Sequence, residues 1–405
     1  MRTSLTLIGN AMSEQAIFKK VTLSDITARA TRNEQVQARV REVVLAPKNK
    51  KPSPRFGTAD VMSICGLTTG TLRSLIASGE LPGGELVGAR REWSLSDLQT
   101  WARATRPDAF RPEGADAIVL TVANFKGGVS KTTTAVSLAQ GLSMRGHKVL
   151  LIDLDPQGSA STLAGLLPVE VSYDMTVAPI FDGSNDSIES SIVETYWSGL
   201  SLVAANAQLS GAEFYLPARQ KADPGFEFWR ALDYALDPIR QQFDVIIIDT
   251  PPSLSYTTIN GLIAADGVLM PCPPSALDYN SSCEFWKLLS DFAGTLYENA
   301  TKEKEFYFFD IVLTRVDNKV SSTSLVREWF KAANGDILLP VEILETAASK
   351  NSSAELGTIY DAAKTSMSSR TYDRAKLAYD QLTELMENKI QHCWHDQLRA
   401  MGEKK

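Results

Sequence analysis

Cysteine and histidine are scarce in this sequence of 405 residues, which contains four cysteines and three histidines. The cysteines (Cys65, Cys272, Cys283 and Cys393) lie far apart and form no Cys-x-x-Cys pair. A zinc site or a disulfide framework usually needs such ligands at characteristic spacings. We therefore expect neither, and we expect reduced thiols in a cytosolic protein.

Long hydrophobic runs are also missing. No stretch of roughly 18 apolar residues is present, which excludes a membrane-spanning helix. The first residues lack the apolar core and small-residue cleavage site of a secretory signal. Hydrophobic residues make up 44% and charged residues 22%, as in folded proteins, and the length predicts two or three domains.

Positive charge is concentrated near the N-terminus. Residues 1–112 contain 17 Lys and Arg against 10 Asp and Glu, a net charge of +7, whereas the remainder carries −14. A basic segment on an acidic body indicates an anionic partner for the first quarter of the chain. A solvated surface would explain the charge equally well, so charge alone leaves both interpretations open.

The first 113 residues contain three different patterns. Residues 12–45 have apolar residues at three- and four-residue intervals and predict a helix whose narrow apolar face needs a partner chain. Residues 47–54, with three prolines and three lysines, predict a linker. Residues 55–106 predict two short helices, a hairpin over 85–93 and a helix that ends near Ala104, before a second linker at 107–113.

Alternating apolar strands and helices begin near residue 114. Continuous apolar runs separated by helices are typical of a parallel sheet that is buried on both faces. We therefore predict an α/β fold with a mostly parallel, doubly wound sheet over 114–405, preceded by a helix within 1–50 and a small module over 55–106. The expected strands are 117–123, 149–154, 200–204, 245–248, 267–270, 306–313 and 337–339, and the expected helices include 132–144, 226–236 and 370–399.

The most specific motif is Asn-Phe-Lys-Gly-Gly-Val-Ser-Lys-Thr-Thr at residues 124–133, between a predicted strand and a predicted helix. Glycines there let backbone N–H groups converge on a phosphate, and the helix N-terminus adds its positive dipole. We expect Lys131 to reach the β- and γ-phosphates and Thr132 to place its hydroxyl on Mg²⁺. Phe125 and Ser130 stand where the standard P-loop has glycines. An incidental Gly-Gly turn is the alternative.

Two further apolar runs end in carboxylates. Asp153 and Asp155 follow the run at 149–152, and Asp249 follows the run at 245–248. Ligands of open α/β sheets collect at the carboxyl ends of the strands. We therefore expect the three carboxylates near the phosphate loop, although each run alone could be a strand that ends in a polar turn.

These motifs together resemble the deviant Walker A ATPases of the ParA/MinD family. The resemblance implies hydrolysis of ATP to ADP with Mg²⁺, with Lys126 reaching across a nucleotide-sandwich dimer to the partner's phosphates and Asp153 orienting the attacking water. It implies catalytic roles for Lys126, Lys131 and Asp153, and metal-binding roles for Thr132, Asp155 and Asp249. The implied nucleotide-binding residues are Lys126, Gly127, Gly128, Val129, Ser130, Lys131, Thr132, Thr133 and Pro340. The family more usually has glycine at the position of Ser130, where a small residue should still fit.

The base-binding end is less defined. Residues 314–317 (Thr-Arg-Val-Asp) and 339–341 (Leu-Pro-Val) end the last two strands, where the family closes over adenine. Guanine specificity would need an Asn-Lys-x-Asp-like stretch, and the Thr-Arg-Val-Asp stretch lacks the Asn and the Lys. ATP is therefore favoured, with no side-chain contact to adenine assigned at residues 314–317.

Residues 59–104 resemble a MerR-like winged helix-turn-helix. The resemblance rests on residues 59–66, on residues 71–82 and on a wing with Gly-Ala-Arg-Arg-Glu-Trp at 88–93. It implies that Thr69, Thr71 and Arg73 lie in the major groove of DNA and that Arg90 and Arg91 contact phosphates or the minor groove. A helical module that docks on protein is the alternative. We expect Trp93 and Trp101 in the core.

The order of the three segments resembles the larger ParA-type partition ATPases of low-copy plasmids and some secondary chromosomes. It implies a cytoplasmic, nucleoid-associated homodimer, or a higher-order assembly on DNA, whose weak ATPase is stimulated by a ParB-type centromere-binding protein and by DNA. The ATP form would bind DNA nonspecifically, and the ADP or nucleotide-free form would repress its own operon. The candidate surface for nonspecific binding is a basic cluster of Lys350, Lys364, Arg370 and Arg374, for which scattered solvated cations are the alternative.

Three other functions are less well supported. A MinD-like membrane-positioning ATPase would need a basic amphipathic C-terminal helix, and residues 391–405 have few apolar anchors. An iron–sulfur carrier would need cysteines placed across a dimer, and Cys272 and Cys283 are expected to be buried thiols instead. A nucleotide-responsive transcriptional regulator with a vestigial site does not explain the intact lysines and aspartates. We therefore expect no membrane partner.

Overall fold

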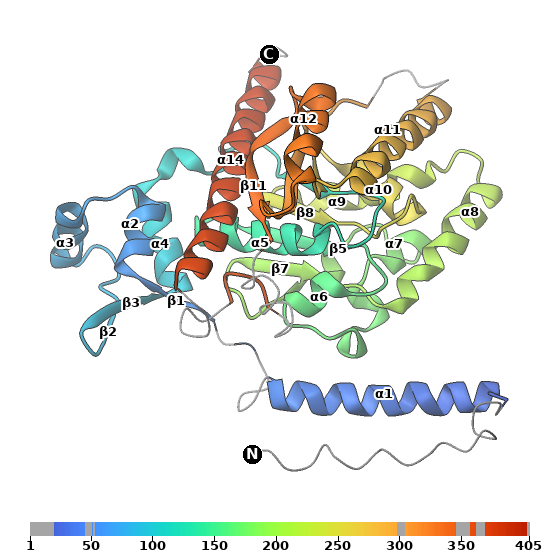
Figure 1. The fold of residues 1–405 in the computed structure, drawn as a ribbon, viewed down its shortest axis with the longest axis horizontal. Helices are drawn as coiled ribbons and strands as arrows, with labels where there is room; N and C mark the ends of the chain where they lie inside the picture. The colour runs from blue at the N-terminus through green and yellow to red at the C-terminus, as the bar shows by residue number, and fades with distance from the viewer. Residues whose placement is uncertain are drawn as a thin grey trace. The chain divides into compact units, whose positions relative to one another are not determined.

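The computed structural model describes residues 20–44, 51, 53–297, 304–345, 357–361 and 369–402, as drawn in Figure 1. The chain divides into two units, Met1–Lys51 and Pro52–Lys405. The first unit contains α1 (Leu23–Val44), which begins later than the predicted residue 12. Thr22 and Asp25 explain this start, because the Thr22 N–H donates to the Asp25 carboxylate and the Asp25 N–H donates to the Thr22 hydroxyl. Residues 20–22 are not helical, and the predicted part over 12–19 lies outside the described residues, as does most of the predicted linker.

A small module of helices and an antiparallel sheet opens the second unit. Its elements are β1 (Arg55–Gly57), α2 (Thr58–Cys65), α3 (Thr69–Ser78), β2 (Glu85–Val87), β3 (Arg90–Ser94) and α4 (Leu95–Thr105), with strand order β1-β3-β2. The helices and the hairpin lie close to their predicted positions, whereas the sequence pattern does not predict β1. The predicted core position of Trp93 and Trp101 is confirmed, since both are fully buried and both indole N–H groups donate to the Pro82 carbonyl at 2.9 Å.

The main sheet has the strand order β11-β10-β9-β4-β8-β5-β7-β6 within the described residues. Its pairs are parallel except for the antiparallel pair β6–β7 at one edge, which confirms the mostly parallel α/β fold. The strands are β4 (Ile118–Val122), β5 (Val149–Asp153), β6 (Val193–Glu194), β7 (Leu200–Val203), β8 (Val245–Asp249), β9 (Gly267–Cys272), β10 (Phe308–Val316) and β11 (Leu338–Leu344).

Helices cover both faces of this sheet because strand residues alternate between two sides. Leu120 and Leu151 belong to a core with α5 (Lys131–Met144) and α14 (Ser369–Gly402), whereas Val119 and Ile152 belong to a core on the opposite face. The opposite face carries α7 (Ala178–Asp182), α8 (Ala212–Ala222), α9 (Ala231–Leu236), α10 (Tyr256–Ala264), α11 (Ala276–Tyr297) and α12 (Ser322–Asn334). The predicted helix over 226–236 is wrong in its first half, since α9 begins at Ala231 after a short 3-10 turn.

The small module shares a core with the α5 and α14 side of the sheet. Trp101 of α4 and Leu142 of α5 belong to one cluster of buried residues. The Gln99 amide donates to the Ser143 hydroxyl at 2.9 Å and to the Ser198 carbonyl at 2.7 Å. The module is therefore attached at the C-terminal end of α5, whose N-terminal end begins at the predicted phosphate loop. No described helix is both long enough and apolar enough to cross a membrane.

Candidate nucleotide site

The predicted phosphate loop connects β4 to α5 and contains two residues with left-handed backbone. Gly128 has a φ of 76° and Ser130 has a φ of 71°. Glycine adopts this conformation readily, whereas at Ser130 the Cβ costs roughly 1 kcal/mol. Ser130 therefore occupies a backbone position that favours glycine. The left-handed turn at Ser130 directly precedes the first residue of α5.

Lys131 is buried in the first turn of α5. Its ammonium donates to the Lys126 carbonyl at 2.8 Å, so the side chain folds back along the loop. Burial lowers the pKa of Lys131, and the nearby charges of Asp249 and Asp155 act in the opposite direction. A buried ammonium beside a glycine-rich loop and a helix N-terminus is well placed to bind an anion.

Asp153 ends β5 and is fully buried. One of its oxygens accepts from the Asp155 N–H at 3.1 Å, and the other accepts from the N–H and the hydroxyl of Ser161 on α6 (Ser159–Leu163), both at 2.8 Å. Burial raises the pKa of Asp153, whereas these hydrogen bonds lower it. The carboxylate is therefore held in one orientation at the carboxyl end of its strand. Asp155 is half-buried, and its charge raises the pKa of both Lys131 and Asp249.

Asp249 ends β8, which pairs with β5 so that Asp153 and Asp249 lie side by side. Both of its carboxylate oxygens are buried, and neither has a hydrogen-bond partner among the described residues. Burial and the charge of Asp153 raise the pKa of Asp249 well above its usual range, while Thr132 and Lys131 lower it. Two orphaned carboxylate oxygens near a threonine hydroxyl are a donor set that suits Mg²⁺.

A metal ion at this position would need further ligands. Within the described residues, no group of three His, Cys, Asp or Glu side chains gathers closely enough to hold an ion. Mg²⁺ commonly takes one or two protein carboxylates and completes its octahedron with phosphate oxygens and water. The residues present therefore fit Mg²⁺ that arrives with a phosphate ligand.

The end of β10 holds the phosphate loop from the other side. The Thr314 hydroxyl donates to the Val129 carbonyl at 2.9 Å, and the Arg315 guanidinium donates to the Gly128 carbonyl at 2.8 Å. Arg315 also pairs with Glu345 at 3.1 Å and has a φ of 51°, an uncommon conformation for a non-glycine residue. The sequence pattern at residues 314–317 indicates the end of a strand but not these contacts with the phosphate loop.

The remaining predicted nucleotide residues differ in their surroundings. Gly127 is exposed, while Thr132 and Thr133 are half-buried in the first turn of α5. Pro340 is exposed on β11, which β10 and β9 separate from β4 in the sheet. Its role in nucleotide binding stays a prediction.

Lys126 has a partner that the sequence does not indicate. Its ammonium lies 2.6 Å from the Asp278 carboxylate, in the first turn of α11. The neighbouring Phe125 ring packs against Phe285 of the same helix, with ring centroids 4.3 Å apart and the ring planes tilted by 39°. The start of the phosphate loop is therefore docked on α11 by one apolar and one ionic contact.

The predicted DNA-binding residues lie in two places. Thr69, Thr71 and Arg73 are exposed on α3, and Arg90 is exposed at the start of β3. Arg91 is half-buried and donates to the Gly83 carbonyl, so it also supports the turn before the hairpin. Arg370 and Arg374 are exposed in the first turns of α14. Lys350 and Lys364 lie outside the described residues.

One expectation about the cysteines is wrong. Cys283 is exposed on α11, whereas Cys272 is buried in β9 as expected, and both are free thiols. Ser282 and Phe285 lie on the buried face of α11, whereas Cys283 lies on the face that this surface helix leaves to solvent.

Known proteins with similar sequences support a nucleotide site at this place. A protein-family model described as an AAA domain matches residues 117–300, which include the phosphate loop, Asp153 and Asp249. The putative replication protein A of Sinorhizobium fredii is 30% identical, and the match covers 81% of this chain and 84% of that protein. Protein SopA of Escherichia coli K12 is 28% identical, and the match covers 78% of this chain and 83% of that protein.

Solved structures give the same fold. The cobyrinic acid a,c-diamide synthase of Mycobacterium smegmatis, with bound ATP analog and magnesium, is 28% identical over 66% of this chain and 93% of that chain, with a TM-score of 0.52. A structure described as a partition protein is 18% identical over 82% of this chain and 95% of that chain, with a TM-score of 0.60, and supports the fold alone. The two relatives, each matched over more than 80% of its own length, show that the chain belongs to the family of ParA-type partition ATPases.

Proposed function

We propose that this chain is a DNA-segregation ATPase that hydrolyses ATP with Mg²⁺ and binds DNA nonspecifically in the ATP state. The observation that carries the proposal is the grouping of Lys131, Asp153 and Asp249 around the phosphate loop. Asp153 and Asp249 are paired across adjacent strands, and the charge of Asp249 raises the pKa of the buried Lys131. This arrangement supplies a cation for phosphate and carboxylates for metal and water at one edge of the sheet.

Each residue has a definite role in this proposal. The Lys131 ammonium compensates the β- and γ-phosphate charge, and it exchanges the Lys126 carbonyl for phosphate oxygens. Thr132 and Asp249 would hold Mg²⁺ directly or through water, with Asp155 close to them, and the ion would supply charge stabilisation at the phosphates. The Lys126 ammonium reaches across the dimer to the phosphates of the nucleotide that the partner protomer binds.

Asp153 is the residue that we propose to orient the attacking water. A carboxylate can accept about four hydrogen bonds, and three already fix its position. The remaining lone pair is available to a water molecule, whose orientation is what hydrolysis of a phosphoanhydride requires of the protein.

We further propose that residues 55–106 bind an operator as a winged helix-turn-helix. Supporting this, the exposed side chains of α3 include Thr69, Thr71 and Arg73, and Arg90 is exposed on the β2–β3 hairpin. A helix that enters the major groove reads bases through side chains near its N-terminus, and these residues occupy the first turns of α3. Binding of its own operon in the ADP or nucleotide-free form would make the chain a repressor.

The assembly and the partners complete the proposal. Val21, Leu23, Ile26 and Val36 are exposed on or beside α1, as a helix that pairs with a second copy would require. We propose a homodimer, or a larger assembly on DNA, that is cytoplasmic and associated with the nucleoid. A ParB-type centromere-binding protein and DNA would stimulate a weak basal ATPase.

The proposal is tested with the full-length chain. We expect slow Mg²⁺-dependent ATP hydrolysis that rises with DNA, together with ATP-dependent binding of random DNA measured by fluorescence anisotropy. Lys131→Ala should abolish both activities because it removes the charge that compensates the phosphates. Absence of Mg²⁺-dependent hydrolysis in the wild-type chain would contradict the proposal, as would ATP-dependent sedimentation with anionic liposomes in place of DNA.

A further inference from the structure

The ammonium of Lys126 is held inside its own chain by Asp278. The Nζ–Oδ1 distance is 2.6 Å, and the side chains of Lys126 and Asp278 are 32% and 14% exposed. The pair joins the start of the phosphate loop to the first turn of α11. Because both groups are mostly removed from water, solvent and salt screen this pair less than a surface pair.

Asp278 is itself fixed by hydrogen bonds with Ser275, the residue before α11. Its N–H donates to the Ser275 hydroxyl at 3.2 Å, and that hydroxyl donates to Oδ2 of Asp278. The capping interaction thus uses one carboxylate oxygen, and Oδ1 is the one that faces Lys126. The two functions of Asp278 can therefore be separated by a substitution that removes charge and keeps the cap.

The backbone of Lys126 is held by hydrogen bonds of both its N–H and its carbonyl group. The backbone N–H of Lys126 donates to the Asn124 side chain at 3.0 Å, and the Lys126 carbonyl accepts from the Lys131 ammonium at 2.8 Å. The preceding Phe125 ring packs against Phe285 of α11. The ammonium can leave Asp278 through side-chain rotation, because the bond from the Lys126 N–H to Asn124 and the contact of Phe125 with Phe285 hold the backbone even when Lys131 turns from the Lys126 carbonyl to a phosphate.

We propose that Asp278 is a positioning residue that retains the Lys126 ammonium in its own protomer until a nucleotide phosphate displaces the carboxylate. This inference rests on the proposed function, in which Lys126 contacts the phosphates of a second copy. The triphosphate of ATP carries more negative charge than one carboxylate, so it competes for the ammonium, whereas ADP lacks the γ-phosphate and competes less. Exchange of one anion for another keeps the lysine charge compensated throughout.

The test uses Asp278→Asn in the full-length chain. Asparagine keeps the shape and can still accept from Ser275, but it removes the charge that holds Lys126. The first measurement is the acetylation rate of Lys126 by an N-hydroxysuccinimide ester without nucleotide, followed by peptide mass spectrometry. We expect the rate to rise by about threefold, as the loss of a partly exposed ion pair predicts.

The second measurement is ATP-dependent dimerisation by light scattering. If Asp278 retains Lys126, Asp278→Asn should dimerise at an ATP concentration lower by about the same factor. In a Lys126→Gln background, Asp278→Asn should not further change the ATP concentration needed for dimerisation, because Asp278 acts through Lys126. Asp278→Glu, which keeps the charge, should restore slow acetylation.

The capping box of α4 provides a matched control. Asp97 and Ser94 exchange the same hydrogen bonds as Asp278 and Ser275. Asp97→Asn should change neither the acetylation of Lys126 nor dimerisation. Unchanged acetylation in Asp278→Asn would overturn the inference, and so would weaker dimerisation, since Asp278 would then be needed in the dimer. A wild-type chain without ATPase or dimerisation would contradict the proposed function, while the acetylation comparison would still decide whether Asp278 holds Lys126.

Discussion

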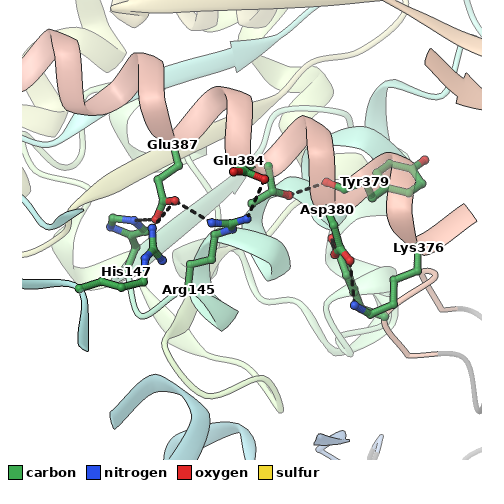
Figure 2. A network of polar contacts seen from close by, with 10 residues as sticks. Arg145, His147, Lys376, Tyr379, Asp380, Glu384 and Glu387 are labelled. Carbon is green, nitrogen blue, oxygen red and sulfur yellow. Dashed lines mark hydrogen bonds and ion pairs between the residues drawn. The ribbon is translucent and has the colours of Figure 1, made fainter. Parts of the chain in front are cut away.

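The imidazole of His147 lies 2.8 Å from the carboxylate of Glu387, and both side chains are buried (Figure 2). Glu387 of α14 also accepts from Arg145 at 2.9 Å and from Arg106 at 2.6 Å. Arg106 follows α4 of the small module, and Arg145 follows α5, which begins at the phosphate loop. A single carboxylate therefore connects the small module, the phosphate-loop helix and the C-terminal helix.

This carboxylate should make the protein acid-sensitive. Burial alone would raise the pKa of Glu387, but the hydrogen bond from His147 and the charges of His147, Arg145 and Arg106 hold it at about 2, below its ordinary 4.5. A depressed carboxylate pKa contributes stability that is complete above the unfolded pKa and is lost as the pH falls toward the folded pKa. The contribution should therefore be present at pH 7 and decline between about pH 4.5 and 2.

We predict that Glu387→Gln lowers the free energy of unfolding at pH 7 by about 3 kcal/mol, because two half-buried guanidinium groups lose their buried counter-charge. The difference from wild type should shrink as the pH falls below about 4.5. Urea unfolding at several pH values measures both effects. Glu384→Gln is the control, since Glu384 is 63% exposed at 3.7 Å from Arg145 and should change stability by less than about 0.5 kcal/mol. An equal loss in both variants would refute the role of Glu387.

A second prediction concerns the backbone at Ser130. Ser130→Gly removes a left-handed conformation that costs roughly 1 kcal/mol, and the extra freedom of glycine in the unfolded chain offsets about half of this gain. We expect the variant to be more stable by roughly 0.5 kcal/mol in urea unfolding. Ser159→Gly, at an exposed position in α6, should instead lose about 0.5–1 kcal/mol. Destabilisation by Ser130→Gly would show that the serine side chain contributes to the loop.

The strands and the phosphate loop could be predicted because their signals are local. A buried parallel strand appears as a continuous apolar run, and Asp153 and Asp249 directly follow such runs. The contacts of Glu387 and Asp278 could not be predicted, because they join residues far apart in the chain and a single carboxylate has no sequence signature. The start of α1 was open to prediction, since Thr22 and Asp25 have the spacing of a capping box.

A third prediction separates nucleotide binding from hydrolysis. Asp153→Asn keeps an oxygen that can accept from Ser161 but removes the charge that we propose to orient the water. ATP binding should persist, turnover should fall by at least about 100-fold, and the ATP-bound dimer should accumulate. Measuring ATP affinity and single-turnover hydrolysis separately tests this prediction. Unchanged turnover would remove Asp153 from the mechanism.

A fourth prediction concerns operator binding by the small module. Arg73→Ala should weaken specific binding by about 1–3 kcal/mol, the range for a side chain that reads a base edge. Arg90→Ala should weaken binding to all sequences alike and reduce the salt dependence, as the loss of a phosphate contact does. Arg91→Ala should also lower the thermal stability, because its guanidinium bonds to Gly83. Footprinting on the promoter region measures the first two effects, and operator binding by a chain without residues 1–112 would contradict the assignment.

The last prediction separates two modes of DNA binding in one chain. The body is acidic, so nonspecific contact with DNA there requires a local group of cations. Arg370 and Arg374 are four residues apart in α14, share a face of the helix and are both exposed. If they bind DNA phosphates, the binding should need ATP, ignore sequence and weaken steeply with salt through counterion release.

Charge reversal of both residues (Arg370→Glu with Arg374→Glu) should remove ATP-dependent binding of random DNA and leave operator binding in the ADP form intact. Salt titrations on operator and random DNA in each nucleotide state measure this difference. Arg399→Glu is the matched control, because Arg399 is 78% exposed near the other end of α14 and pairs with Asp396. It should leave both activities unchanged, since it lies about 40 Å along the helix from the two arginines at 1.5 Å per residue. Loss of both activities in the double variant, or of neither, would contradict a separate nonspecific mode, because one surface would then serve both kinds of DNA or these arginines would serve none.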